Sequence, residues 1–170
     1  MSTATTNDDL NTDVLVVGAG PAGSATAAWA ARAGLDVVLA DAETFPRDKP
    51  CGDGLTPRAI AELDQLGLSP WLTGRARNRG LRANGFGQEL YLPWPGGSLP
   101  AYGGAAPRLG LDDAIRSQAL EAGVTMAEGL RAVDVRMDSG RVRSVVLRGK
   151  AGHAREITCR RLIVADGARS

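Results

Sequence analysis

The fold is decided by residues 13–41, DVLVVGAGPAGSATAAWAARAGLDVVLAD. This stretch opens with Asp13 to Val17, an apolar run rich in β-branched residues that is typical of a strand buried on both faces of a parallel sheet. After a glycine turn, the alanine-rich run Pro21 to Ala33 predicts a helix with proline in its first turn and Gly34 as its C-terminal cap. Leu35 to Ala40 predicts a second strand. The order of strand, turn, helix and strand predicts a Rossmann-like α/β fold built on a parallel sheet.

The three glycines of the turn each omit a side chain for a different reason. Gly18 allows the tight turn, Gly20 lets the backbone approach a pyrophosphate, and Gly23 lets the helix lie close to the strand. Pro21 and Ala22 open the helix, whose N-terminal amide groups point towards a phosphate. We therefore expect the whole turn to bind the diphosphate of a dinucleotide.

Asp41 ends the second strand and stands 18 residues beyond Gly23. An acid at this place accepts hydrogen bonds from the ribose hydroxyls of an adenosine. An acid rather than a basic residue also argues against a 2′-phosphate on the bound nucleotide. The spacing by itself leaves two cofactors, FAD and NAD.

The composition is that of a soluble globular protein without a strong charge bias. Of the 170 residues 44% are hydrophobic, and 20 Lys and Arg against 19 Asp and Glu give a net charge of +1. This balance offers no general electrostatic case for binding nucleic acid or a membrane surface. The two cysteines are too few for a disulfide framework and lack the paired spacing of metal ligands. With no basic leader, and no stretch near the roughly 18 apolar residues of a membrane span, we expect a cytoplasmic enzyme.

Three kinds of segment are expected along the chain. Residues 1–12 are polar and predict a disordered tail. Residues 13–68 and 108–170 predict the nucleotide-binding domain. Residues 69–107, which Pro and Gly break into short strands, predict an excursion into a partial, mostly antiparallel substrate layer. The loop Glu43 to Leu55 directly follows a parallel strand, and since ligands gather at the carboxyl ends of such strands, it begins beside the cofactor.

The rest of the nucleotide domain alternates helix and strand. The expected elements are a helix capped by Thr56, a helix at Leu111–Ala122 with Asp112 and Asp113 in its first turn, a third parallel strand at Val124–Met126, a meander at Leu130–Arg136, Arg141–Arg148 and Glu156–Cys159, and a buried strand at Leu162–Ala165. The last strand runs into Asp166 and Gly167, three residues before the end. Because a strand with nothing to cover its far side is an unusual end for a doubly wound domain, we expect a truncated one.

Four segments together resemble the geranylgeranyl reductase family of FAD-dependent oxidoreductases, within the group of para-hydroxybenzoate hydroxylase-like flavoproteins. They are VGAGPAGS at 17–24, FPRDKPCGDGL at 45–55, PRLGLDDAI at 107–115 and LIVADGARS at 162–170. The likeness runs from Asp13 to Ser170. The first and last segments are shared by many flavoproteins, whereas the second is specific, and KPCGDGLTPRAI is most similar to the menaquinone-reducing branch of mycobacteria and their relatives.

The resemblance implies that the cofactor is FAD and assigns further residues to its site. Asp41 then holds the adenosine ribose, and Asp166 lies at the flavin and nicotinamide side. The other implied contacts are Arg47, Cys51, Gly52 and Gly54 in the loop past the flavin, Arg108 ahead of a helix, and Ala132, whose backbone meets the adenine. Each has a plain alternative, because Arg47 and Arg108 also suit a solvated surface and Asp166 also suits a turn.

Cys51 is the one candidate for a direct chemical role. A thiol beside a flavin modulates hydride delivery or the fit of the substrate. The alternative is that this cysteine is simply a small hydrophobic residue.

By this resemblance the activity is FAD-dependent reduction of isoprenoid double bonds, in a geranylgeranyl group or the prenyl chain of menaquinone. The electron donor stays open. Relatives continue with a second flavin-binding motif and the rest of a substrate domain, through which the resemblance also implies contact with the membrane surface. Two alternatives remain: a class A flavin monooxygenase acting on an aromatic substrate, and a truncated nucleotide-binding module without turnover.

Overall fold

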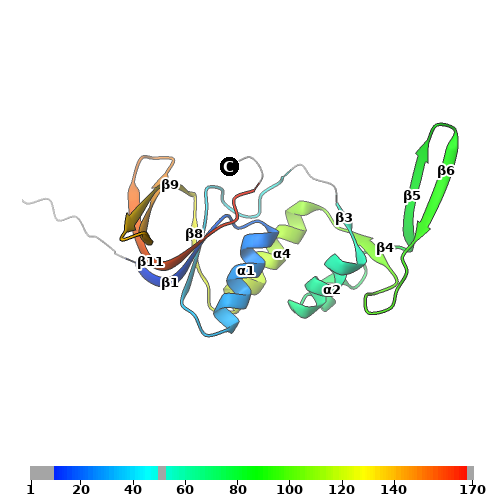
Figure 1. The fold of residues 1–170 in the computed structure, drawn as a ribbon, viewed down its shortest axis with the longest axis horizontal. Coiled ribbons are helices and arrows are strands. Elements are labelled where there is room, and N and C mark those ends of the chain that lie inside the picture. Colours follow the sequence, from blue (N-terminus) through cyan, green and yellow to red (C-terminus); the bar gives the residue numbers. More distant parts are fainter. Residues whose placement is uncertain (1–9, 50–52, 168–170) are drawn as a thin grey trace, which may run out of the picture. The chain divides into compact units, whose positions relative to one another are not determined.

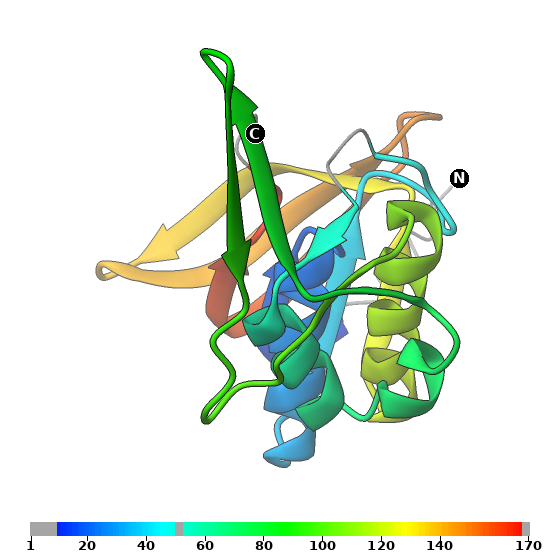
Figure 2. The ribbon, with the colours of Figure 1, turned by 90° about the vertical axis from the view of Figure 1, so that its right-hand side faces the viewer.

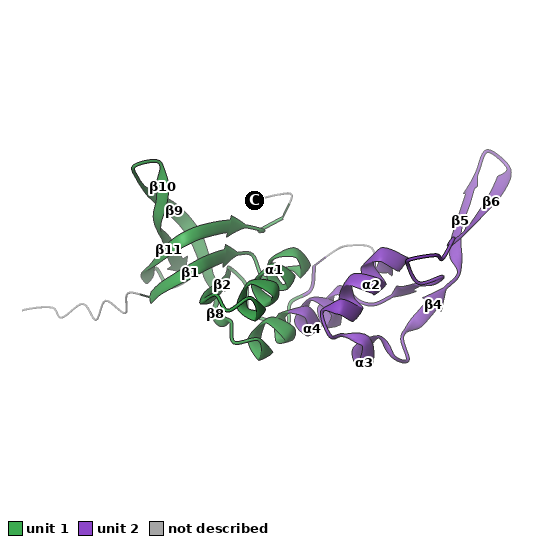
Figure 3. Ribbon diagram, turned by 60° about the horizontal axis from the view of Figure 1, so that its bottom comes forward, with its two compact units in different colours: residues 1–47, 116–170 green, residues 48–115 purple. Residues whose placement is uncertain are grey.

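The computed structural model describes residues 10–49 and 53–167. The chain divides into two compact units, residues 1–47 with 116–170 and residues 48–115 (Figure 3). The second unit therefore begins earlier and ends later than the excursion expected at 69–107.

A six-stranded mixed sheet forms the first unit, in the order β8-β2-β1-β11-β10-β9 (Figure 1). The strands are β1 (Leu10–Val17), β2 (Val37–Asp41), β8 (Thr125–Glu128), β9 (Leu130–Asp138), β10 (Arg141–Gly149) and β11 (Ala154–Val164). The pairs β8–β2, β2–β1 and β1–β11 are parallel, and the pairs β11–β10 and β10–β9 are antiparallel. The predicted α/β fold, a parallel sheet with a β-meander, is confirmed.

The largest departures from the predicted strands are at β1 and β11. β1 begins at Leu10, because Leu10 to Thr12 pair with Ile157 to Cys159, so the expected tail is wrong in its last three residues. β11 is a single strand where two were predicted. Arg160 and Arg161 continue it, since the register with β1 runs on through them.

The core of this unit lies between the parallel strands and the meander. It gathers Leu15, Val17, Val38, Ala40, Ala127, Leu130, Val145, Leu147, Ile157 and Cys159. The alternate residues of β1 and β2, such as Val16 and Leu39, point to the other face and are also buried. Helix α1 (Pro21–Arg32) packs against both strands, which explains why they are apolar on both faces.

The end of β11 does not share this burial. Val164 is 64% exposed, so the expectation of a buried strand at Leu162–Ala165 is wrong there. The reason is the pairing: β10 reaches β11 only as far as Thr158, so among the described residues the end of β11 has β1 as its single neighbour.

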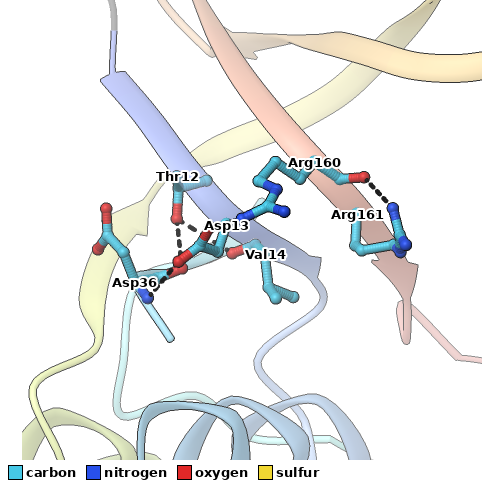
Figure 4. Close-up of polar contacts among 6 residues, drawn as sticks. All are labelled: Thr12, Asp13, Val14, Asp36, Arg160 and Arg161. Atoms are coloured by element: carbon cyan, nitrogen blue, oxygen red, sulfur yellow. Dashed lines mark hydrogen bonds and ion pairs between the residues drawn. The ribbon is translucent and has the colours of Figure 1, made fainter. Parts of the chain in front are cut away.

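Asp13 ties three parallel strands together (Figure 4). Its carboxylate accepts a hydrogen bond from the Asp36 amide at 3.1 Å, just before β2, and pairs with Arg160 of β11 at 3.0 Å. The hydrogen bond from the Asp36 amide, and after it the hydrogen bond from the Arg160 guanidinium, hold the pKa of Asp13 below its usual value. Thr12 adds a hydrogen bond to the Asp36 carbonyl oxygen at 2.8 Å.

The second unit carries short strands, the helices α2 and α3, and the start of a further helix. The strands and these two helices are β3 (Gly54–Leu55), α2 (Pro57–Gln65), α3 (Ser69–Leu72), β4 (Ala76–Asn78), β5 (Gly80–Gly85), β6 (Gln88–Pro93) and β7 (Gly103–Ala105). β3, β7 and β4 form an antiparallel sheet, and α2 packs against β7, which is why this unit includes residues expected in the nucleotide domain. Thr56 caps α2 as predicted, accepting a hydrogen bond from the Ala59 amide at 3.3 Å.

β5 and β6 form a two-stranded hairpin (Figure 2). Leu81 pairs with Leu92, and Ala83 with Leu90, so one face is apolar, and all three leucines are exposed. Helix α4 (Arg108–Glu121) starts in this unit, three residues before its expected start at Leu111. Among the described residues, no helix is long and apolar enough to cross a membrane.

Candidate functional site

The glycine turn lies where β1, β2 and β11 end. The Gly18 amide donates a hydrogen bond to the Ala40 carbonyl oxygen, and the Ala165 amide donates one to the Val17 carbonyl oxygen, both at 2.7 Å. Gly18 has a φ of +101°, and a Cβ there would lie 2.5 Å from the Ala165 oxygen. Gly18 is therefore required by the tight turn, as predicted.

Gly23 is required by packing. A Cβ at this position would overlap the carbonyl oxygen of Gly18 and lie 3.2 Å from the Ala165 side chain. The start of α1 therefore lies directly against the end of β1, which is the close approach that the sequence predicts.

Gly20 differs from the other two glycines. Its φ of −70° suits any residue, and a Cβ there would contact only the Arg47 guanidinium at 3.5 Å, an ordinary van der Waals distance. Neither backbone strain nor packing therefore requires glycine here. Glycine here is what the predicted pyrophosphate contact requires, because the N-terminal amides of a helix favour a negative charge.

Asp41 turns back towards the glycine turn. Its carboxylate accepts hydrogen bonds from the Ala19 amide at 2.7 Å and the Glu43 amide at 2.9 Å. The side chain is half-buried at the end of β2. Each carboxylate oxygen can accept a further bond, so the geometry suits the predicted ribose contact. Ala19 was not among the predicted residues, although its place inside the glycine turn is the signal that points to it.

Arg47 comes to the same turn from the loop after β2. Its guanidinium lies against Gly20, as described, and over the ring of Phe45 at 5.0 Å. A guanidinium pairs well with phosphate oxygens, because it can donate two parallel hydrogen bonds. The turn, Asp41 and Arg47 thus lie together at this end of the sheet, and their contacts with an adenosine diphosphate remain a prediction.

Asp166 also reaches this end of the sheet. It follows β11, and its Cα would lie 2.7 Å from a Cβ at Gly18, while its side chain points to solvent. Ala132 lies on β9, paired with Leu147, and packs against the core. The structure therefore brings Asp166 beside the turn, and the adenine contact of Ala132 remains a prediction.

The remaining predicted residues belong to the second unit or lie outside the described residues. Arg108 is the first residue of α4, and its guanidinium binds Asp112 through two hydrogen bonds of 2.6 and 2.8 Å. Asp112 is fully buried, so its role is to pair with Arg108 rather than to complement the helix dipole from the first turn. Gly54 lies in β3 with open space around it. Cys51 and Gly52 lie outside the described residues.

Comparison with known proteins identifies relatives over nearly the whole chain. The menaquinone reductase of Mycobacterium tuberculosis is 61% identical over 163 residues, which are 95% of this chain and 39% of that protein. The rifampicin monooxygenase of Rhodococcus hoagii is 31% identical over 160 residues, 93% of this chain and 32% of that protein. A solved geranylgeranyl bacteriochlorophyll reductase-like protein of Thermoplasma acidophilum matches with a TM-score of 0.80 at 25% identity, over 93% of this chain and 40% of that chain.

These matches confirm the predicted likeness to menaquinone and geranylgeranyl reductases. The chain spans about two fifths of the length of its menaquinone reductase relative. The family model described as FAD binding domain matches residues 11–170, which decides between the two cofactors that the spacing left open. The chain therefore belongs to the FAD binding domain family, and FAD is its cofactor.

Proposed function

We propose that this chain supplies the FAD-binding part of a reductase that saturates isoprenoid double bonds, in the prenyl chain of menaquinone or a geranylgeranyl group. The observation that carries the proposal is the 61% identity to menaquinone reductase across 95% of the chain. The rifampicin monooxygenase matches a similar share of the chain at half that identity, 31%. A monooxygenase acting on an aromatic substrate is therefore the weaker alternative.

The residues of the first unit have the chemistry to bind and orient the cofactor. When bound and reduced, FAD supplies a hydride for one alkene carbon, and a proton goes to the other. The amides of the glycine turn and the Arg47 guanidinium are proposed to bind the diphosphate, and the Asp41 carboxylate the ribose. Asp166 is proposed for the flavin side.

Other parts of the proposal rest on the sequence. Arg108 is proposed to contact FAD in addition to binding Asp112, and the Cys51 thiol to modulate hydride delivery or the fit of the substrate. Contact with the membrane surface, if the isoprenoid is taken from a bilayer, is proposed for segments that relatives carry beyond the matched part. The chemical identity of the electron donor is open to any two-electron reductant.

A chimera tests the proposal. The matching N-terminal part of M. tuberculosis menaquinone reductase is replaced by this chain, and the purified chimera is incubated anaerobically with menaquinone and dithionite. We expect bound FAD and, once air has reoxidised the quinol ring that dithionite itself reduces, a product whose prenyl chain is two hydrogens heavier by mass spectrometry. A folded chimera that binds FAD and leaves menaquinone unchanged, or that adds oxygen to an aromatic substrate in air, would contradict the proposal.

A second candidate is an FAD-binding module without turnover of its own, for which the supporting observation is the match of residues 11–170 to the FAD binding domain model. The same chimera separates the two candidates. Under the reductase proposal the chain supports turnover when it is joined to the rest of a reductase, whereas under the module proposal it supports FAD binding alone.

A further inference from the structure

Phe45 lies under two guanidinium groups in the loop that follows β2. The Arg47 guanidinium carbon is 5.0 Å from the centre of its ring, and that of Arg116 is 5.2 Å away. Both distances fall within the range in which the electron-rich face of an aromatic ring attracts a cation. Phe45 is half-buried, so this attraction is less weakened by water than at a fully exposed site.

Arg116 is in turn anchored to the sheet. Its guanidinium pairs with the Glu128 carboxylate at 3.3 Å, and the two side chains are 16% and 29% exposed. Glu128 ends β8 and is the register partner of Asp41 at the end of β2. The carboxylate compensates the charge of Arg116, which allows two guanidinium groups to share one ring.

The other end of this arrangement reaches the glycine turn. The Arg47 guanidinium lies 3.5 Å from where a Gly20 Cβ would be, at the position kept clear for the pyrophosphate. An arginine side chain has many rotamers, and holding it in one before the ligand arrives lowers the entropy lost on binding. Phe45, Arg47, Arg116 and Glu128 all belong to the first unit.

We infer that Phe45 is a positioning residue for FAD: its ring holds the Arg47 guanidinium over the pyrophosphate-binding turn, and Arg116, fixed by Glu128, steadies the ring. In this role Phe45 acts through Arg47 rather than through a contact of its own with the cofactor. The inference rests on FAD binding and not on the proposed prenyl reduction.

The first test is a titration of the 170-residue chain with FAD, followed by flavin fluorescence. Phe45→Leu keeps an apolar side chain but removes the aromatic face, and we expect the Kd for FAD to rise about three- to tenfold. Phe45→Trp should restore the original Kd. The binding of ADP, used as a competitor, should weaken by the same factor, because the effect concerns the diphosphate half of FAD. A matched control is Trp71→Leu, which removes the contact of Arg75 with a ring at 4.1 Å in the second unit and should leave the Kd unchanged.

The second test is a double-mutant cycle. If Phe45 acts through Arg47, Phe45→Leu should add less than about twofold to the Kd of Arg47→Ala. Arg116→Gln provides an independent variant with the same expectation in that background. A Kd unchanged by Phe45→Leu in a folded protein, or full additivity with Arg47→Ala, would overturn the inference. A failure of the unaltered chain to bind FAD would overturn the cofactor site as a whole, and the role of Phe45 with it.

Discussion

At the scale of single residues, the three glycines of the turn separate into two kinds. Gly18 and Gly23 are required by the protein, because a Cβ at either position meets backbone atoms. Gly20 has room for a side chain. A substitution at Gly20 therefore tests the ligand, and one at Gly23 tests the fold.

We predict that Gly20→Val folds but loses FAD. Valine at the residue that caps α1 costs about 1 kcal/mol of stability, since it is a poor N-cap, and its methyl groups occupy the place of the pyrophosphate. Thermal unfolding and FAD titration measure the two effects separately. Gly23→Ala is the matched control and should lower the free energy of unfolding by more, about 1–3 kcal/mol, because the clash is with backbone. Stoichiometric FAD in folded Gly20→Val would refute the assignment of the turn.

Arg108 is a test of both structure and cofactor. Arg108→Ala leaves the buried Asp112 carboxylate without its bidentate partner, and we expect a loss of about 3 kcal/mol in the free energy of unfolding. The double variant Arg108→Ala/Asp112→Ala should recover part of this loss, which denaturant unfolding will show.

The proposed contact of Arg108 with FAD predicts a further effect. In the folded Arg108→Ala protein, FAD binding should weaken by roughly 1.5–3 kcal/mol, the scale of a lost charge-assisted hydrogen bond. An unchanged Kd would leave Arg108 with its structural role at Asp112 alone.

At the scale of elements, Asp13 links β1 to β2 and β11, and its lowered pKa makes this link depend on pH. A carboxyl group whose pKa is depressed in the folded state stabilises the protein at pH values above its pKa in the unfolded chain, which is near 3.8. This stabilisation is lost as the pH falls through the pKa of the folded state. We predict that Asp13→Asn is less stable than the unaltered chain at neutral pH. The difference in unfolding free energy should shrink towards zero below pH 3.8, and a difference independent of pH would contradict the role of the charge.

The elements that the sequence predicts well are those with local causes. The helix α1 has proline at its start and Gly34, with a φ of +83°, at its end, so its bounds follow from neighbouring residues. The start of α4 was missed because Gly110 lies inside its first turn and marks a break by the usual rules. β11 was divided because two exposed arginines interrupt its apolar pattern, while the pairing that continues through them comes from β1, far away in sequence.

In the candidate site, too, the sequence predicts contacts between residues that are close in the chain and misses those between distant residues. The glycine turn and Asp41 are close in sequence and were predicted together, and the structure places them in contact through Ala19. Arg116 had no such signal, because its contact with Phe45 joins residues 71 positions apart. The bounds of the second unit were missed for a similar reason, since they depend on the pairing of β3 with β7.

At the scale of the whole molecule, we predict that this chain binds FAD reversibly and does not itself reduce a prenyl double bond. The matched part is 39% of the menaquinone reductase relative. An isoprenoid needs an apolar cavity that holds it and keeps water from the reduced flavin. The apolar face of the β5–β6 hairpin instead exposes Leu81, Leu90 and Leu92, at 52%, 55% and 47%.

The measurement is anaerobic incubation of the chain with a prenyl quinone or a geranylgeranyl lipid and dithionite-reduced FAD. The products are read by mass spectrometry after air has reoxidised any quinol ring, so that a gain of two hydrogens reports the prenyl chain. No product two hydrogens heavier is expected from the 170-residue chain, and the chimera with menaquinone reductase serves as the positive control. Since a two-stranded hairpin is marginally stable without a cover, the chimera should also protect the amides of β5 and β6 from hydrogen exchange more than the chain alone does. A mass gain of two from the chain alone would show that its own residues suffice for the substrate.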